Sequence, residues 1–126
     1  MGRIEHKVRL CGERTCKEQK GLFDTGSDYT YITPQLAKEL DVKYTGFTTQ
    51  TEVADKRKIP TKEAELKELE VLGCKRVKPR VMVANIGKEV IVGNDVMQLF
   101  GIKLDPKKHK IKVDKCKSSV ILYFTN

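Results

Sequence analysis

The sequence predicts an all-β domain with one or two short helices. Short runs of β-branched and aromatic residues recur from end to end and are separated by turn residues, which is typical of strands. Only two segments carry both a start and a stop signal for a helix, and both are short. The 126 residues contain no linker and no repeat, so we expect one domain, residues 1–126, with its own hydrophobic core.

The N-terminal third is expected to form a hairpin, a short strand and a helix. Gly12 lies between two loosely alternating segments and indicates a tight turn there. Thr33 as N-cap and Pro34 at the first helical position indicate a helix that ends near Asp41. The expected segments are strands over residues 5–11, 15–23 and 30–32 and a helix over residues 34–40.

The middle of the chain is expected to form a long hairpin. Residues 44–53 are rich in Thr and aromatic residues, and the polar residues 54–57 follow as a tip. Residues 59–71 have helix-forming side chains as well, but a helix would start poorly after Pro60. We therefore expect residues 59–71 to return from the tip as a strand.

The C-terminal third is expected to hold the second helix among further strands. Asn94 is a suitable helix cap and Gly101 a suitable stop. The apolar run over residues 118–124 is interpreted either as a strand buried against a second copy or as an internal strand. The expected segments are strands over residues 80–85, 88–92, 110–113 and 118–124 and a helix over residues 94–100.

The net charge of +8 allows two interpretations: a nucleic-acid footprint, or a lysine- and glutamate-rich surface. Lysines and acids are interspersed along most of the chain, which favours the second. Residues 103–117 differ, because seven lysines stand against two aspartates and alternate with Ile and Val, as in a strand with a basic solvent face. Tryptophan is absent and aromatic residues make up 6%, so a base-stacking platform, and with it a nucleic-acid partner, is not expected.

No apolar stretch approaches the roughly 20 residues of a membrane span, and the first residues lack the apolar core of a signal peptide. We therefore expect a cytoplasmic protein without a membrane partner. The four cysteines contain no CxxC pair, so we expect no metal site, and in a reducing compartment we expect free thiols. A bridge between Cys11 and Cys16 across the turn GERT stays open as an alternative.

The sharpest motif is the run from Phe23 to Ser27, in which apolar residues lead into Asp24-Thr25-Gly26. The tripeptide alone also makes an ordinary turn. Here it follows an expected strand, and a strand and a helix follow it. Far downstream, residues 90–95 form an apolar run that ends in a glycine and enters the second expected helix.

With these residues the chain resembles the retropepsin-like aspartic proteases, the single-domain relatives of pepsin. Five ordered matches within about residues 8–113 carry the resemblance: residues 24–27, 31–40, 53–59, 91–93 and 101–105. It implies a closed retropepsin-like acid-protease barrel. It also implies site residues: catalytic Asp24, the loop residues Thr25, Gly26 and Ser27, substrate contacts from Asp28, Val53, Ala54 and Asp55, and the structural residues Ile91, Val92 and Gly93.

The resemblance further implies roles for the loop side chains. The Thr25 hydroxyl would lock the loop by a hydrogen bond to the partner subunit, and the Ser27 hydroxyl would bond the outer oxygen of Asp24. Gly26 suits a close approach of backbone to the carboxyl group.

The chemistry that the resemblance implies fits a pair of carboxyl groups that share one proton. The ionised group takes a proton from water and the protonated group polarises the peptide carbonyl, so no metal or organic cofactor is expected. The sequence contains a single Asp-Thr-Gly, which is half of such a pair. We therefore expect a homodimer with Asp24 of each chain on the two-fold axis and an extended peptide under the hairpin at residues 51–59.

Two departures from the family pattern bear on the site. The family often has Arg after the downstream glycine, paired with the acid four residues past the catalytic Asp; here Asn94 stands in that place and leaves Asp28 to find another partner or stay solvated. Residues 56–58 make the hairpin tip cationic, either as a solvated turn or as a preference for acidic substrate residues.

Two rival functions remain open. One is a binding module of the same fold that holds peptides without useful turnover. The other is a basic β-domain that binds nucleic acid through residues 103–117. Neither His6 nor His109 has a nucleophile nearby in the sequence, and no P-loop, GxGxxG or HExxH is present, so other hydrolase and nucleotide sites have no support.

Overall fold

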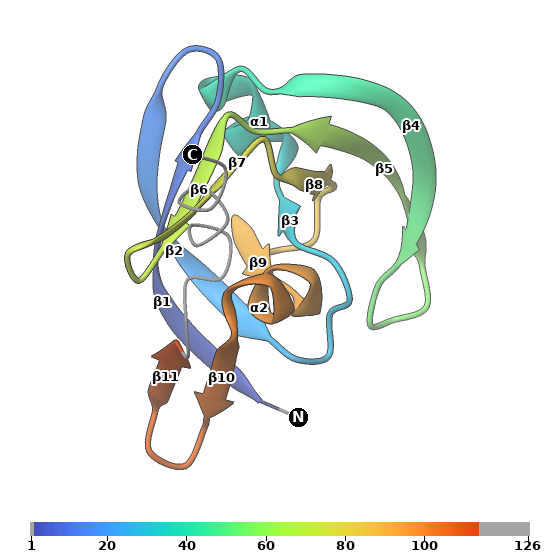
Figure 1. Ribbon diagram of the computed structural model, residues 1–126. Helices are drawn as coiled ribbons and strands as arrows, with labels where there is room; N and C mark the ends of the chain where they lie inside the picture. Colours follow the sequence, from blue (N-terminus) through green and yellow to red (C-terminus); the bar gives the residue numbers. More distant parts are fainter. Residues whose placement is uncertain (1, 114–126) are drawn as a thin grey trace.

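The structure is a computed structural model, and it describes residues 2–113 of the chain (Figure 1). Two short helices accompany eleven strands in this part of the chain. The helices are α1 (Pro34–Leu40) and α2 (Asn94–Phe100). The strands are β1 (Arg3–Cys11), β2 (Cys16–Asp24), β3 (Tyr31–Ile32), β4 (Lys43–Glu52), β5 (Lys58–Glu65), β6 (Glu68–Val71), β7 (Cys74–Val77), β8 (Arg80–Val83), β9 (Val90–Val92), β10 (Ile102–Asp105) and β11 (Lys110–Val113).

Nine of these strands form one curled sheet in the order β4-β5-β8-β3-β9-β2-β1-β6-β7, while β10 and β11 pair only with each other (Figure 1). The predicted all-β class with one or two short helices is therefore confirmed. The outermost strands, β4 and β7, each pair with a single neighbour in the described residues. The sheet thus curls like part of a barrel, and the ladder between its two ends is not closed in that part of the chain.

The predicted hairpin of the N-terminal segment forms as β1 and β2, with Cys11 opposite Cys16 across the turn. A disulfide joins these two residues, so the expectation of free thiols is wrong for this pair. Cross-strand neighbours bring their Cβ atoms within reach of a bridge, which is why the four-residue turn permits it. The turn also docks on the end of α1, where a Cβ on Gly12 would lie 2.2 Å from the carbonyl oxygen of Leu40.

Helix α1 forms as its capping residues predict. The Thr33 hydroxyl accepts a hydrogen bond from the Leu36 amide, Pro34 occupies the first turn, and Asp41 ends the helix in the left-handed conformation at a φ of 64°. The helix buries Leu36 and Leu40 in the core that is shared by the sheet and α2. The helix comes directly after β3, the strand that follows the Asp24 loop.

The predicted strand over residues 59–71 is in fact two strands. Strand β5 pairs with β4 and β8, whereas β6 leaves that ladder and pairs with β1. The break falls at Leu66, which is 1% exposed, and burial of this side chain in the core accompanies the change of direction. Strands β7 and β10 were not predicted, because a segment of four residues is too short for its pattern to identify a strand.

The central strands bring the two distant motifs together. Strand β9 runs parallel to β2, with Leu22 beside Ile91 and Phe23 beside Val92, and antiparallel to β3. Because β2 and β9 are parallel, the end of β2 and the start of α2 lie at the same end of these two strands. The predicted strand at residues 118–124 lies outside the described residues. No helix among the described residues is long and apolar enough to cross a membrane.

Candidate functional site

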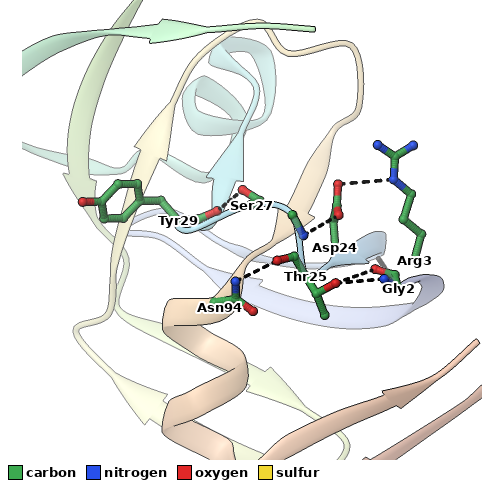
Figure 2. Close-up of polar contacts among 8 residues, drawn as sticks. Gly2, Arg3, Asp24, Thr25, Ser27, Tyr29 and Asn94 are labelled. Atoms are coloured by element: carbon green, nitrogen blue, oxygen red, sulfur yellow. Dashed lines mark hydrogen bonds and ion pairs between the residues drawn. The ribbon is translucent and has the colours of Figure 1, made fainter.

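Asp24 is the last residue of β2, and its side chain emerges where the strand enters a loop. Phe23 before it is fully buried, while Asp24 itself is 8% exposed. Within the loop, the Gly26 amide donates to Oδ1 of Asp24 at 2.9 Å (Figure 2). The Ser27 amide donates to the Asp24 carbonyl at 3.1 Å. The carboxyl group is therefore nearly buried and is held in one orientation by the backbone that follows it.

The second oxygen of Asp24 faces a cation. Nε of Arg3, at the start of β1, lies 3.4 Å from Oδ2 of Asp24 (Figure 2). The antiparallel pairing of β1 with β2 places Arg3 directly opposite Asp24, so this contact follows from the hairpin register. Sequence reasoning missed Arg3; its position opposite Asp24 could have been counted from the Cys11–Cys16 turn.

Thr25 forms hydrogen bonds with Gly2 and with Asn94 of its own chain. Its hydroxyl accepts from the Gly2 amide at 2.8 Å, and its backbone amide donates to the Gly2 carbonyl at 3.1 Å. The side-chain amide of Asn94 donates to the Thr25 carbonyl at 2.9 Å (Figure 2). The expected bond from Thr25 to a partner subunit stays a prediction, since Gly2 of the same chain engages this hydroxyl here.

Ser27 does not take the role expected for it. Its hydroxyl donates to the Tyr29 carbonyl at 2.7 Å and not to Asp24, because the Asp24 oxygens already face Gly26 and Arg3. Asp28, one residue further, is exposed and has no polar partner for its side chain among the described residues. Asn94, which replaces the family's Arg, bonds Thr25 instead of Asp28, so Asp28 stays solvated in this chain.

A buried polar pair attaches the loop to α2. Thr30 is fully buried, and its hydroxyl donates to Oδ1 of Asp95 at 2.8 Å while its amide donates to Oδ2 at 3.2 Å. The Gly93 amide in turn donates to the Thr30 hydroxyl at 3.1 Å. Gly93 must lack a side chain, because a Cβ there would lie 2.2 Å from the Tyr29 carbonyl oxygen. Thr30 and Asp95 were missed by sequence reasoning, and an Asp in the first turn of a helix was their only signal.

An open cleft of about 650 Å³ lies beside Asp24, between the loop and the β4–β5 hairpin. Val53 and Ala54 of the hairpin line it, as does Ile91 of β9. Asp55 does not line it, because its carboxylate accepts from the backbone and the guanidinium of Arg57 within the hairpin tip, at 3.1 and 2.7 Å. The tip cation Arg57 is thereby paired inside the hairpin.

A chain of hydroxyl groups connects the cleft floor to the hairpin. The Tyr31 hydroxyl lies 3.4 Å from that of Thr51, which lies 2.6 Å from that of Thr61. Tyr31 and Thr51 line the cleft, whereas Thr61 is buried at 2% exposure. These hydroxyl contacts connect the hairpin, just before its tip, to Tyr31 of β3.

The structure therefore gathers most of the predicted site residues around one cleft. Asp24, Gly26, Ser27, Asp28, Val53, Ala54 and Ile91 line it. Val92 is fully buried behind it, and Thr25 and Gly93 hold the loop from the far side. Asp55 stands apart at the tip. Among residues 2–113, no group of three or more His, Cys, Asp or Glu side chains is placed to hold a metal ion.

Chemically, the cleft offers one nearly buried carboxyl group with a fixed orientation. Two more acids of the cleft wall, Asp28 and Glu52, are exposed and carry no backbone amide bond to their side chains among the described residues. Among the described acids that line the cleft, Asp24 alone is nearly buried and bonded by a backbone amide, which is the kind of group that proton transfer requires.

The sequence and the fold were compared with known proteins. The aspartyl protease family model matches residues 7–115, and no curated protein matches the chain. The solved structure of the EIAV protease complexed with the inhibitor HBY-793 is 26% identical, with a TM-score of 0.59 over 82% of this chain and 93% of that one.

Two further solved structures share the fold at lower identity. A retropepsin-like aspartic protease from Rickettsia conorii is 18% identical, with a TM-score of 0.57 over 82% of this chain and 77% of that one. The retroviral protease-like domain of Ddi1 from Leishmania major is 13% identical, with a TM-score of 0.59 over 90% of each chain.

Proposed function

Because the chain belongs to the aspartyl protease family, we propose that it is an aspartic endopeptidase whose active site forms when two copies meet at Asp24. The observation that carries this proposal is the Asp24 carboxyl group, which is nearly buried, bonded by the Gly26 amide and open to a cleft under a β-hairpin. The retropepsin-like fold of the chain supports the same conclusion.

Water is the nucleophile in this mechanism. Two carboxyl groups a hydrogen-bond distance apart cannot both be ionised, so they share one proton. The ionised group takes a proton from the water while the protonated group donates to the peptide carbonyl oxygen. The tetrahedral intermediate then collapses, the nitrogen of the scissile bond receives a proton, and the C–N bond breaks. The Gly26 amide orients the Asp24 carboxyl group throughout.

The need for a second copy follows from the single prepared carboxyl group. A homodimer with a two-fold axis beside Asp24 brings the same residue of both chains together. It also encloses the cleft, which is open in one chain. The substrate is then an extended peptide that lies between the Asp24 loop and the β4–β5 hairpin, with its backbone paired as an added strand.

The contact between Arg3 and Asp24 favours a second candidate function. Nε of Arg3 lies 3.4 Å from Oδ2 of Asp24 and so engages the carboxyl oxygen that the Gly26 amide leaves free. A chain that kept this contact in the dimer would bind peptides without hydrolysing them, as a peptide-binding module of the same fold.

Digestion of a peptide library at acidic and neutral pH tests the proposal. The wild-type chain is expected to cleave internal peptide bonds, and Asp24→Asn is expected to lower the rate by about 10³-fold or more, since Asn cannot accept a proton from water. Asp41→Asn is the matched control, because Asp41 is exposed at the end of α1 and does not line the cleft. Equal rates for wild type and Asp24→Asn would contradict the proposal, and peptide binding without cleavage by wild type would favour the binding module.

A further inference from the structure

The β10–β11 hairpin is an amphipathic ribbon outside the nine-stranded sheet (Figure 1). One face packs on the protein: Ile102 is buried there, and Leu104, Ile111 and Val113 pack against the core. The alternate positions face solvent, as the period of a strand requires. The solvent face and the turn carry Lys103, Asp105, Lys107, Lys108, His109, Lys110 and Lys112.

The charge of this ribbon is not balanced locally. Its five lysines, all exposed, stand against the single acid Asp105. None of the ion pairs formed within residues 2–113 involves any of these five lysines. Elsewhere in that part of the chain, cations such as Arg9, Lys17 and Arg57 do have acidic partners. Within residues 2–113, the ribbon is therefore a concentration of positive charge without acidic partners.

The register of the hairpin places two of these lysines directly against each other. Lys103 is paired with Lys112 across the two strands. Like charges at directly opposed positions destabilise a hairpin, so local folding does not explain this arrangement. The same two side chains line a hollow of about 400 Å³ together with Gly101 and Val113. An anion bound between the two ammonium groups would remove their repulsion.

We propose that the β10–β11 ribbon binds the phosphate backbone of a nucleic acid without reading its sequence. Lys110 and Lys112 are alternate residues of β11, about 7 Å apart, and Lys103 lies across the ladder, so the three are separate cations suited to a chain of phosphates. The ribbon has no arginine, and lysine binds phosphate as a point charge, which suits contact with a backbone without reading its sequence. This binding needs no aromatic stacking, so the low aromatic content of the chain is no obstacle to it.

A membrane surface fits the ribbon less well. Peripheral binding to lipid needs apolar side chains that enter the bilayer boundary next to the cations. The apolar side chains of this hairpin are turned toward the protein core instead. The solvent face offers charge alone, which is the sequence-independent part of nucleic-acid binding.

Fluorescence anisotropy of a labelled oligonucleotide of about 20 nucleotides, single-stranded and duplex, tests the proposal over about 50 to 200 mM salt. We expect micromolar binding that weakens steeply with salt. The double variant Lys103→Gln/Lys112→Gln is expected to reduce the slope of log K against log salt by about 1–2. Because it removes a like-charge pair, it is also expected to melt no lower than wild type. Lys38→Gln/Lys43→Gln, which removes two exposed lysines of α1 and β4, is the matched control and is expected to bind like wild type.

Three results would overturn the proposal. The first is no binding at the lowest salt concentration. The second is equal weakening by the ribbon variant and by the control variant, which would indicate a diffuse charge effect. The third is tighter binding to phosphatidylserine vesicles or to polyglutamate than to the oligonucleotide. Peptide cleavage plays no part in this measurement, so its result is independent of the proposed protease activity.

Discussion

The side-chain amide of Asn94 donates a hydrogen bond to the carbonyl oxygen of Thr25 at 2.9 Å, and so connects the first residue of α2 to the loop that carries Asp24. This bond crosses 69 positions of the chain. The backbone amide of Asn94 donates to the Ser27 carbonyl at 2.8 Å, so the same residue holds the loop at two points. The start of α2 is therefore a fixed support for the candidate catalytic loop.

Replacing Asn94 by Ala is expected to remove the side-chain bond and leave the backbone bond in place. We expect the free energy of unfolding to fall by about 1 kcal/mol, the usual contribution of one such hydrogen bond. The cleavage rate should fall more than stability alone explains, because the Asp24 loop loses its support. Urea denaturation and peptide hydrolysis measure the two effects. Asn85→Ala, an exposed Asn of the loop after β8, is the control, and an equal effect of both variants would contradict this role of Asn94.

Gly93→Ala tests the close contact between α2 and the catalytic loop. The new Cβ would lie 2.2 Å from the Tyr29 carbonyl oxygen, so the loop or the helix must move. We expect a loss of roughly 2–3 kcal/mol in the free energy of unfolding. Gly21→Ala is the control, because the nearest atoms to its Cβ lie at 3.4 Å. A Gly93→Ala variant as stable as Gly21→Ala would show that the contact is not required.

The Cys11–Cys16 disulfide is expected to stabilise the chain modestly. It closes a loop with a sequence separation of 5, and a loop this short restricts the unfolded chain little. We expect Cys11→Ala/Cys16→Ala to lower the free energy of unfolding by about 2 kcal/mol. Because the hairpin turn lies against α1 and away from Asp24, cleavage by the folded variant should not change. Denaturation curves measure the first effect, and a variant as stable as wild type would contradict the expectation.

The contact between Lys17 and Glu39 predicts a local pH dependence. The hydrogen bond from Lys17, followed by that from Gln35, lowers the pKa of the Glu39 carboxyl group below its ordinary value. This contribution to stability is therefore present above the ordinary pKa of a glutamate and is lost as the pH falls through the lowered value. In Lys17→Gln, an NMR titration is expected to place the pKa of Glu39 closer to its ordinary value. An unchanged titration would exclude Lys17 as the main cause.

The strand pattern and the helices could be predicted because their signals are local. The Thr33-Pro34 start of α1 and the β1–β2 turn are both legible from adjacent residues. The break between β5 and β6 could not be predicted, because it depends on which ladder each half joins. Burial of Leu66 accompanies that change of partner and is visible only in the folded chain.

In the candidate site, too, features of adjacent residues could be predicted and contacts between distant segments could not. The motif around Asp24 could be recognised from the sequence as the candidate catalytic loop, since its residues are contiguous. Contacts that join distant segments were not predicted: Arg3 with Asp24, Thr30 with Asp95, and Asn94 with Thr25. For Ser27 the expected bond to Asp24 was wrong, and its hydroxyl donates to the Tyr29 carbonyl instead.

The most direct test of the shared active site is a mixing experiment with wild-type and Asp24→Asn chains. The two are unfolded together, refolded at equal concentration and assayed at a fixed total concentration. If each active site needs Asp24 from both subunits, random pairing leaves about a quarter of the dimers active, and the rate should be about a quarter of that of wild type alone. A rate of about half would mean that each chain acts by itself, and it would contradict the central claim.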